Sequence, residues 1–330
     1  MAIKLALLGL GTVGQGVYDT IVARKDKLRR LFGEEVEIVA ALVKNGEKKR
    51  PVDRNVKLTT DFRDILAIHD LDVVVEAIVG REPARTYNLA LLERGVHVIS
   101  ANKECIAYEG RNFTETAKRH GVTFSYEASV GGGIPIIRTI RELLQVNRIE
   151  KIEGVLNGTC NFILTLMREN GFSFEEALNH AQVAGYAEAD PTNDIEGWDA
   201  YFKLMVLSEL AFGEQPSWQT TERKGITEIT KEALLLAKEN GNRIKLLVTL
   251  ERTADGVEAT VKPVEIGSDH PLYSVEGVNN AVHIQADLVG DLILQGPGAG
   301  AGPTASAIVE DLAHVFVKAT HGKRLLQSVK

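Results

Sequence analysis

Two charged residues in the second half of the chain, Asp199 and Lys203, are spaced so that one helix face would carry both. Side chains four residues apart are neighbours on a helix, and such a pair is usually a solvent-exposed salt bridge. Here the same face continues into Val206 and Leu207, which are apolar, whereas an exposed face would stay polar. The pattern therefore predicts that the two charges point into a partly closed space.

The segment before this helix is rich in turn-forming residues and carries two further acids, Glu188 and Asp194. We expect it to be a loop that brings both carboxylates close to Asp199 and Lys203. Three carboxylates around one ammonium group suit a small zwitterionic substrate, and a lysine among them can transfer protons. We therefore expect the acids to hold a substrate and Lys203 to act as the acid or base.

A glycine motif close to the N-terminus indicates a nucleotide site. A strand is predicted from 3 to 8 and an amphipathic helix from the motif to about Phe32, and G-x-G-x-x-G lies between them. In this context the glycines permit a tight turn, let the backbone approach a pyrophosphate and let the helix pack on the strand. The alternative is a glycine-rich turn that binds nothing. The motif residues, which we expect to contact a cofactor, are Gly9, Leu10, Gly11, Thr12, Val13 and Gly14.

The second predicted strand, 36–43, ends without the acidic residue that would hold the ribose hydroxyls of NAD. It ends instead at Lys44, several basic residues follow, and Lys57 lies a little beyond. The missing acid and these cations suggest room for the 2′-phosphate of NADP. A solvated basic loop is an equally acceptable interpretation.

Further alternation of strands and helices predicts an α/β domain with a parallel sheet. Residues 73–77 are read as a continuous apolar strand, as expected at the centre of such a sheet. The strand at 96–100 ends at Ala-Asn-Lys, and ligands bind at the carboxyl ends of parallel strands. Lys103 is therefore placed to meet cofactor or substrate, unless it is an ordinary exposed lysine. The remaining elements are expected at 83–94 and near 110–120 as helices and at 123–126 as a strand.

A glycine-rich loop at 127–135 follows this domain. It could bind an anion at a helix start, bind a hard cation through carbonyl oxygens, or serve as a domain hinge, and the residues alone favour the hinge. Beyond it, Cys160 could be a nucleophile, but no histidine lies nearby in the sequence. A buried small residue is the better interpretation.

The C-terminal third is expected to be mixed in structure. A helix is predicted at 229–241, paired strands at 244–253 and 257–263, and further β structure at 280–294. A second glycine-rich loop, 295–304, opens a last helix at 304–321. This arrangement suggests that the C-terminus returns to the nucleotide domain.

Composition excludes several classes of function. The 330 residues allow two domains, and a net charge of −7 argues against a nucleic-acid or anionic-membrane surface. No apolar run approaches the ~20 residues that span a bilayer, and the N-terminus runs straight into a strand without a signal peptide. Two cysteines far apart predict a reducing cytoplasm and no disulfide framework. We expect a cytoplasmic protein that acts on a small molecule and binds neither nucleic acid nor membrane.

Six blocks, in this order and over nearly the whole chain, resemble those of the homoserine dehydrogenases. They are G-L-G-T-V-G at 9–14, A-N-K at 101–103, E-A-S-V-G-G-G-I-P at 127–135, L-N-G-T-C-N-F-I-L at 156–164, G-Y-A-E-A-D-P…D…G-W-D-A-Y-F-K at 185–203 and G-P-G-A-G-A-G-P-T-A at 296–305.

The resemblance implies an α/β fold with a Rossmann-type nucleotide-binding domain, 1–128 and 301–330, to which the C-terminal helix returns. An α+β catalytic and dimerisation domain would span 129–300, with its dimerisation part at roughly 129–136 and 245–300. A homodimer or a dimer of dimers is expected. Because the chain ends soon after its last helix, a short form without the C-terminal regulatory domain is also expected.

The resemblance also implies roles for single residues. Lys203 would protonate the aldehyde oxygen, and Lys103 would lie at the nicotinamide and substrate end. Glu188 and Asp199 would contact the substrate, with Gly185 contributing its backbone. A loop contact to NADP or NAD would come from Gly300, and a structural sodium ion would be held, largely by backbone carbonyls, at Glu127, Val130, Gly132 and Ile134. The sequence departs from the family at Cys160, where Thr is frequent, and at Cys105, where an apolar residue is common.

The implied reaction interconverts L-aspartate 4-semialdehyde and L-homoserine by direct hydride transfer with NAD(P)H, in threonine, methionine and isoleucine biosynthesis. Two alternatives stay open. A phosphorylating semialdehyde dehydrogenase would use Cys160 as acyl carrier and depend on phosphate. A non-catalytic NADP sensor would bind the cofactor and turn over nothing.

Overall fold

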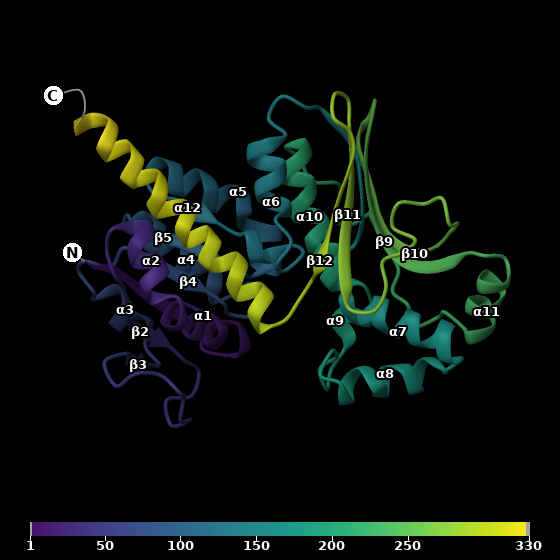
Figure 1. Cartoon of the computed structure of the whole chain (residues 1–330), viewed down its shortest axis with the longest axis horizontal. Coiled ribbons are helices and arrows are strands. Elements are labelled where there is room, and N and C mark those ends of the chain that lie inside the picture. The colour runs from purple at the N-terminus through teal and green to yellow at the C-terminus, as the bar shows by residue number, and fades with distance from the viewer. Residues whose placement is uncertain (1, 328–330) are drawn as a thin grey trace. The chain divides into compact units, whose positions relative to one another are not determined.

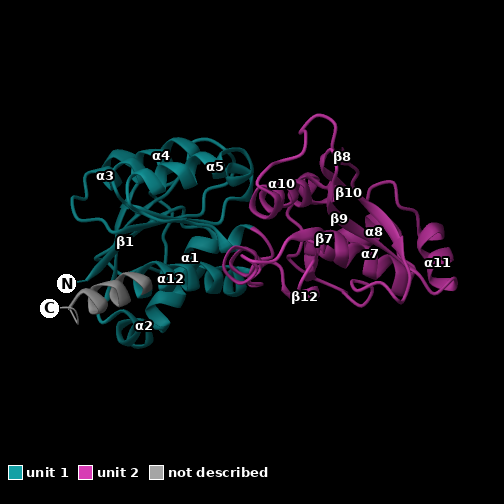
Figure 2. Ribbon diagram, turned by 90° about the horizontal axis from the view of Figure 1, so that it is seen from above, with its two compact units in different colours: residues 1–129, 300–330 teal, residues 130–299 magenta. Residues whose placement is uncertain are grey.

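The structure, a computed structural model, describes residues 2–327, with side chains as far as Val317. The chain forms two compact units, coloured separately in Figure 2. Unit 1 comprises Met1–Ser129 and Gly300–Lys330, and unit 2 comprises Val130–Ala299. The elements of both are labelled in Figure 1.

A six-stranded parallel sheet with the order β3-β2-β1-β4-β5-β6 forms the centre of unit 1. This is the strand order of the dinucleotide-binding Rossmann fold, so the predicted α/β class is confirmed. Most of the sheet residues are buried, as expected when helices cover both faces. The strands are β1 (Ile3–Leu8), β2 (Val36–Leu42), β3 (Lys57–Thr59), β4 (Val73–Glu76), β5 (His97–Ser100) and β6 (Phe124–Ser125).

Two helices of unit 1 differ from the sequence prediction. The single helix expected as far as Phe32 is divided at Arg24, whose backbone (φ −109°, ψ 14°) leaves the helical region. The helix expected near 110–120 begins earlier, at Lys103, because the side chain of Asn102 caps it by accepting a hydrogen bond from the Cys105 amide. The helices of this unit are α1 (Thr12–Ala23), α2 (Lys25–Phe32), α3 (Phe62–Leu66), α4 (Ala84–Glu93), α5 (Lys103–Arg119) and α12 (Ala301–Gln327), with a 3₁₀ turn at Glu127–Ser129.

The C-terminal helix α12 packs against α1, which confirms the predicted return of the chain to the nucleotide domain. A Cβ atom on Gly16 would lie 2.9 Å from the carbonyl oxygen of Ala301, so the two helices approach closely there. Further along α12, Ile308 and Leu312 enter the same buried cluster as Val17 of α1. Residues far apart in sequence therefore share one core.

Unit 2 is built on a second six-stranded sheet, with the order β12-β11-β7-β9-β10-β8. Its pairs are antiparallel except β10 with β8. The predicted pairing of the strands near 244–253 and 257–263 is confirmed. The strands are β7 (Ile149–Val155), β8 (Glu222–Arg223), β9 (Arg243–Thr253), β10 (Gly256–Ile266), β11 (Asn279–Ala286) and β12 (Gly290–Pro297).

The helices of unit 2 pack on this sheet and around its ends, and α10 contacts both β9 and β10. Ile152, Leu250 and Ile284, which lie side by side on three strands, are fully buried. The helices are α6 (Ile136–Arg138), followed by a π-helical turn at Thr139–Leu143, then α7 (Gly158–Asn170), α8 (Phe174–Val183), α9 (Thr192–Ile195), α10 (Trp198–Phe212) and α11 (Lys231–Glu239).

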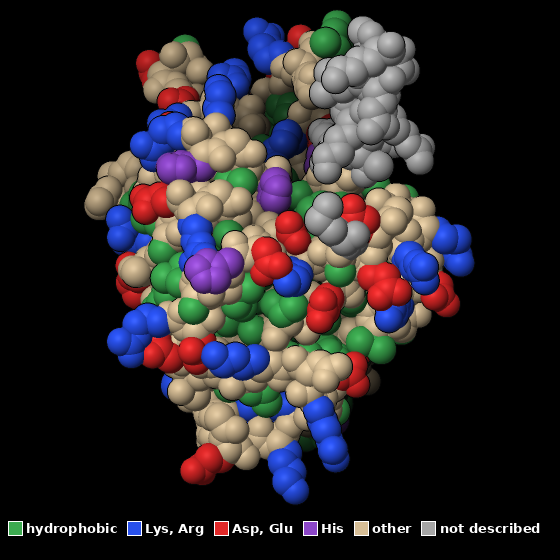
Figure 3. Space-filling view, turned by 90° about the vertical axis from the view of Figure 1, so that its left-hand side faces the viewer, with side chains coloured by type: hydrophobic (Ala, Val, Ile, Leu, Met, Phe, Trp, Pro, Cys, Tyr) green, Lys and Arg blue, Asp and Glu red, His purple; other side chains and the backbone are tan. Residues whose placement is uncertain are grey.

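Basic and acidic side chains are interspersed on the face drawn in Figure 3, and neither sign covers it alone. Within the described range, none of the helices combines the length and the apolar character needed to cross a bilayer.

Candidate functional site

Asp199 and Lys203 lie on the buried side of α10. The helix begins after Gly197 and ends before Gly213, and both glycines adopt a positive φ that other residues adopt at a cost. Lys203 Nζ lies 2.7 Å from Asp199 Oδ2, and the two side chains are only 9% and 6% exposed. The pair is therefore a buried ion pair and not a surface salt bridge.

The Lys203 ammonium has a second fixed partner, the backbone carbonyl of Leu156, at 2.6 Å. An ammonium group carries three N–H donors, and these two contacts occupy two of them. The third has no protein partner within the described part of the chain. The lysine is thus held by two acceptors and keeps one donor for a ligand.

Asn157 joins the two carboxylates of the site. Its side-chain Nδ2 donates to Asp194 Oδ1 at 2.7 Å and to Asp199 Oδ2 at 2.8 Å, and its Oδ1 accepts from the Cys160 amide at 2.7 Å as the N-cap of α7. This residue was not among those predicted from the sequence. The available signal was an Asn-Gly step between a strand and a helix, a preferred N-cap pattern.

The Cys160 thiol lies beside this network but is not set up as a nucleophile. It is fully buried and donates to the Asp194 carbonyl at 3.1 Å. Burial, together with the charges of Asp194 and Asp199, raises the pKa of the Cys160 thiol well above its usual value. The thiolate that an acyl carrier needs is disfavoured here.

Of the three residues predicted in the loop at 185–197, only Asp194 is hydrogen-bonded into the network, as far as the structure describes the chain. Asp194 reaches the network through Asn157, whereas Glu188 is exposed and forms no ion pair or side-chain hydrogen bond with the site among the described residues. Its backbone carbonyl accepts from Gln182 Nε2 at 3.1 Å. Gly185, with φ +76°, is also exposed. The structure therefore joins Asp194, Asp199 and Lys203, and leaves Glu188 and Gly185 facing solvent.

The glycine motif of unit 1 has the geometry that a pyrophosphate requires. A Cβ on Gly9 would lie 2.7 Å from the Ala77 carbonyl oxygen and one on Gly14 only 2.1 Å from the Gly9 carbonyl oxygen, so both positions need glycine for packing. At Gly11 nothing lies within 4 Å of such an atom, and no side chain caps α1. The free N–H groups at the start of a helix are a site for phosphate, and the residues present fit a dinucleotide. Leu10 lies in the turn, and Thr12 and Val13 are the first two residues of α1.

Lys44 and Lys57 lie at different positions along the strand direction of the sheet. Lys44 is exposed and lies just beyond the carboxyl end of β2, whereas Lys57 begins β3 and pairs in register with Ala40. The Lys57 ammonium already has a partner, since its Nζ lies 3.0 Å from Asp64 Oδ1. Binding of a phosphate by Lys57 would compete with that carboxylate.

Lys103 and Gly300 are both in unit 1. Lys103 is the first residue of α5, directly after the capping residue Asn102 and at the carboxyl end of β5. Gly300 has a φ of +112° and immediately precedes α12, and its carbonyl accepts from the Thr304 amide. Both lie where the chain turns at the end of an element, as expected of ligand-contacting positions.

The four residues expected to hold a cation lie in a segment that crosses the boundary between the units. Glu127 belongs to unit 1, and Val130, Gly132 and Ile134 belong to unit 2. The Ile134 carbonyl accepts from the Ile136 amide, and Gly132 adopts a positive φ of 56°. Among the described residues, no group of three or more His, Cys, Asp or Glu side chains could hold a metal ion.

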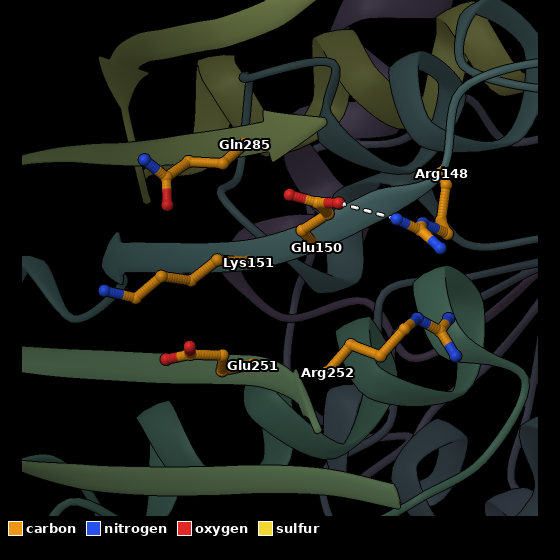
Figure 4. Close-up of a pocket in the computed structure, with 6 residues that line it drawn as sticks. All are labelled: Arg148, Glu150, Lys151, Glu251, Arg252 and Gln285. Atoms are coloured by element: carbon orange, nitrogen blue, oxygen red, sulfur yellow. Dashed lines mark hydrogen bonds and ion pairs between the residues drawn. The ribbon is translucent and has the colours of Figure 1, made fainter. Parts of the chain in front are cut away.

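A surface depression on the sheet of unit 2 shares no residue with this site. Figure 4 shows that its lining is polar and comes from β7, β9 and β11 and from Arg148, directly before β7, with Arg148 and Glu150 joined at 2.9 Å. Its lining residues are Arg148, Glu150, Lys151, Glu251, Arg252 and Gln285.

Comparison with known proteins finds one family over most of the chain. The model of the homoserine dehydrogenase NAD-binding domain matches residues 9–127, and the homoserine dehydrogenase model matches residues 135–313. Homoserine dehydrogenase from Bacillus subtilis is 42% identical over 96% of this chain and 73% of its own length.

Solved structures give the same result. A homoserine dehydrogenase from Thiobacillus denitrificans superimposes with a TM-score of 0.92 at 42% identity, over 97% of this chain and 74% of its own. A hyperthermophilic archaeal homoserine dehydrogenase in complex with NADPH gives a TM-score of 0.82 at 28% identity, over 96% of this chain and 98% of its own. With two family models that together span most of the sequence and relatives above 40% identity, the chain belongs to the homoserine dehydrogenase family.

Proposed function

We propose that Lys203 performs the proton transfer in the reaction of this family, the NAD(P)-dependent interconversion of L-homoserine and L-aspartate 4-semialdehyde. The observation that carries the proposal is the buried ammonium of Lys203, fixed by Asp199 at 2.7 Å and by the Leu156 carbonyl at 2.6 Å with one N–H left over. Positioned acids of this kind contribute ~10²–10⁴ to a rate.

The bound nicotinamide supplies the hydride in the reducing direction and accepts it in the oxidising direction. As the aldehyde carbon becomes an alcohol carbon, its oxygen gains negative charge. The remaining N–H of Lys203 donates its proton to that oxygen. In the reverse direction the neutral amine takes the proton from the homoserine hydroxyl, while Asp199 keeps the side chain oriented.

The substrate's own ammonium group needs carboxylate partners, and Glu188 is proposed as one because its side chain is not engaged elsewhere among the described residues. Asp194 and Asp199 are proposed as further contacts, and the Gly185 backbone as another. A charge buried in this region is tolerated only when an opposite charge pairs with it. The carboxylates therefore favour a zwitterionic substrate, whose ammonium group can pair with them, over a neutral one.

The cofactor is proposed to be held by the glycine motif and Gly300, with Lys103 at the nicotinamide end. NADP is favoured because no acid ends β2 and Lys44 lies in that place. The archaeal relative described with NADPH supports the same choice. Three further features are proposed from the family resemblance. They are a sodium ion at 127–134, a homodimer or dimer of dimers formed through 129–136 and 245–300, and a cytoplasmic location. Light scattering, metal analysis and cell fractionation would test these three.

The experiment that tests the function measures homoserine-dependent reduction of NAD and of NADP, with and without inorganic phosphate, for the wild type and Lys203→Ala. We expect turnover that is independent of phosphate and a kcat lower by ~10²–10⁴ in the variant. Phosphate-dependent turnover would support an acyl-transfer mechanism at Cys160. Cofactor binding without turnover would support the sensor alternative.

A further inference from the structure

A buried acid in unit 1, Glu76, takes no part in the chemistry described above. It is the last residue of β4, at the centre of the parallel sheet, and it is fully buried. The prediction that 73–77 is a continuous apolar strand is wrong at this position. A buried carboxyl group costs free energy unless its oxygens find donors, so its partners explain why it is tolerated.

Four donors from three places in the chain surround the Glu76 carboxyl group. Oε2 accepts from Ser100 Oγ at 2.6 Å and from Asn88 Nδ2 at 3.3 Å. Oε1 accepts from the Ile78 amide at 2.7 Å and from Asn102 Nδ2 at 3.5 Å. Burial raises the pKa of Glu76, while these hydrogen bonds oppose the rise. Both oxygens are thus satisfied without a cation.

These contacts fix two turns at the carboxyl edge of the sheet. The bond to Ile78 shapes the turn after β4. Asn102 is held by Glu76 on one side and by the Gly80 carbonyl at 2.8 Å on the other, and its backbone amide donates to Ser100 Oγ at 3.1 Å. Glu76 therefore connects the turn after β4 with the turn after β5.

Asn102 transmits this constraint to α5. Its Oδ1 accepts from the Cys105 amide at 3.1 Å and so sets the first turn of the helix, whose first residue is Lys103. A helix start that depends on one capping side chain is sensitive to where that side chain is held. The position of the Lys103 backbone thus depends on Glu76 through one intermediate residue.

We propose that Glu76 is a positioning residue for the reaction, which holds Asn102 and, through it, Lys103 at the nicotinamide end of the site. The inference rests on the proposed function, since it assumes that Lys103 meets cofactor or substrate. It differs from a purely structural role, because Glu76 then affects turnover even when the protein stays folded.

The test compares Glu76→Gln with Asp72→Asn. Asp72 precedes the other end of the same strand, where its Oδ2 accepts from the Lys4 amide at 2.7 Å, so both variants change a carboxylate to an amide near β4. We expect Glu76→Gln to retain its circular dichroism spectrum and to lose about 10–100-fold in kcat, as ~1 Å misplacements can cost. Asp72→Asn should keep the wild-type kcat. A folded Glu76→Gln with the kcat of Asp72→Asn overturns the proposal.

A double-mutant cycle identifies the route. If Glu76 acts through Lys103, Glu76→Gln should lower kcat by less than ~3-fold once Lys103→Ala is present, because coupled residues are not additive. An equal loss in both backgrounds overturns the coupling. Full activity of Lys103→Ala alone would instead remove the proposed role of Lys103, which distinguishes the two failures. If Glu76→Gln does not fold, Asn102→Ala cuts the same link with Glu76 and Ser100 still paired, and it should show the same loss and the same non-additivity.

Discussion

The side-chain amide of Asn157 donates a hydrogen bond of 2.8 Å to Asp199, a residue 42 positions further along the chain. The same nitrogen donates to Asp194, and the side-chain oxygen caps α7. One amide therefore combines two functions that can be separated: it begins a helix, and it fixes the carboxylate that holds Lys203.

We predict that Asn157→Ala loses both functions and Asn157→Ser only one. Loss of an N-cap lowers the free energy of unfolding by ~0.5–2 kcal/mol, and serine is itself a good cap. Serine is, however, too short to join two carboxylates. Denaturant titration should show that serine restores most of the stability, whereas steady-state kinetics should show a kcat still reduced by about 10-fold, a loss within the range of a mispositioned group. Wild-type kcat in Asn157→Ser would contradict this assignment.

The sequence alone predicted the parts of the site whose residues are close together in the chain. The helix with Asp199 and Lys203 and the glycine motif after β1 depend on spacing, caps and apolar continuation, all of which are local. The α/β class followed from the alternation of elements, and the strand order agrees with it.

What the sequence could not predict depends on contacts between distant residues. Asn157 and Glu76 are polar residues whose partners lie up to 42 and 26 positions away, so neither is recognisable from its neighbours. The exposure of Glu188 on its loop was likewise not predictable, because the path of a loop is set by tertiary contacts such as that of Thr159 Oγ1 with the Tyr186 carbonyl. The periodicity of residues along the chain carries no information about such contacts.

Cofactor choice should depend on Lys44 more than on Lys57. Charge-assisted hydrogen bonds contribute on the order of 1.5–3 kcal/mol each, but the Lys57 ammonium must leave Asp64 to make one. We expect Lys44→Ala to weaken NADPH binding at least about 10-fold, as the loss of such a contact implies, with little effect on NADH binding. Lys57→Ala should weaken NADPH binding by a smaller factor, again with little effect on NADH binding. Fluorescence titration with both cofactors measures this. Equal losses for NADPH and NADH in either variant would exclude a 2′-phosphate contact there.

The Cys160 thiol should be dispensable for turnover. Burial and the neighbouring carboxylates raise its pKa, so little thiolate is present near neutral pH. We predict that Cys160→Ala keeps kcat within ~3-fold of the wild type, since a buried small side chain mainly affects packing. Iodoacetamide at pH 7.5 should inactivate the wild type slowly, at a rate no faster than that of the variant. Rapid inactivation of the wild type alone would restore the acyl-carrier mechanism.

Glu276 should make the protein sensitive to acid. Burial would raise its pKa, yet hydrogen bonds from Arg168 and Lys245 hold it at about 2 in the folded state, against an ordinary value of 4.5. A carboxyl group whose folded pKa is depressed contributes stability above its unfolded pKa, and this contribution is lost as the pH falls toward the folded pKa. The window is therefore about pH 4.5 to 2.

We predict that Glu276→Gln is less stable than the wild type at pH 7 and that the difference in unfolding free energy shrinks as the pH falls through this window. The matched control is Glu150→Gln, which removes an exposed partner of Arg148 and should change stability little at any pH. Urea titrations between pH 7 and pH 3 provide the measurement. A difference that does not depend on pH would show that Glu276 stabilises the fold by packing alone.

Lys203→Arg distinguishes proton transfer from simple charge. An arginine keeps the positive charge beside Asp199, but its guanidinium scarcely releases a proton, and its planar fork does not match the two acceptors that hold the ammonium. If Lys203 is the acid, the arginine variant should recover little of the ~10²–10⁴-fold loss expected for alanine. NADPH affinity should stay near the wild-type value in both variants, because the glycine motif and Lys203 belong to different units. The competing residue is Lys103, which is proposed above to lie at the nicotinamide end of the site. If Lys103→Ala abolishes turnover with cofactor binding intact while Lys203→Ala retains most of its kcat, then the acid is Lys103, and the buried pair on α10 serves only to hold the substrate.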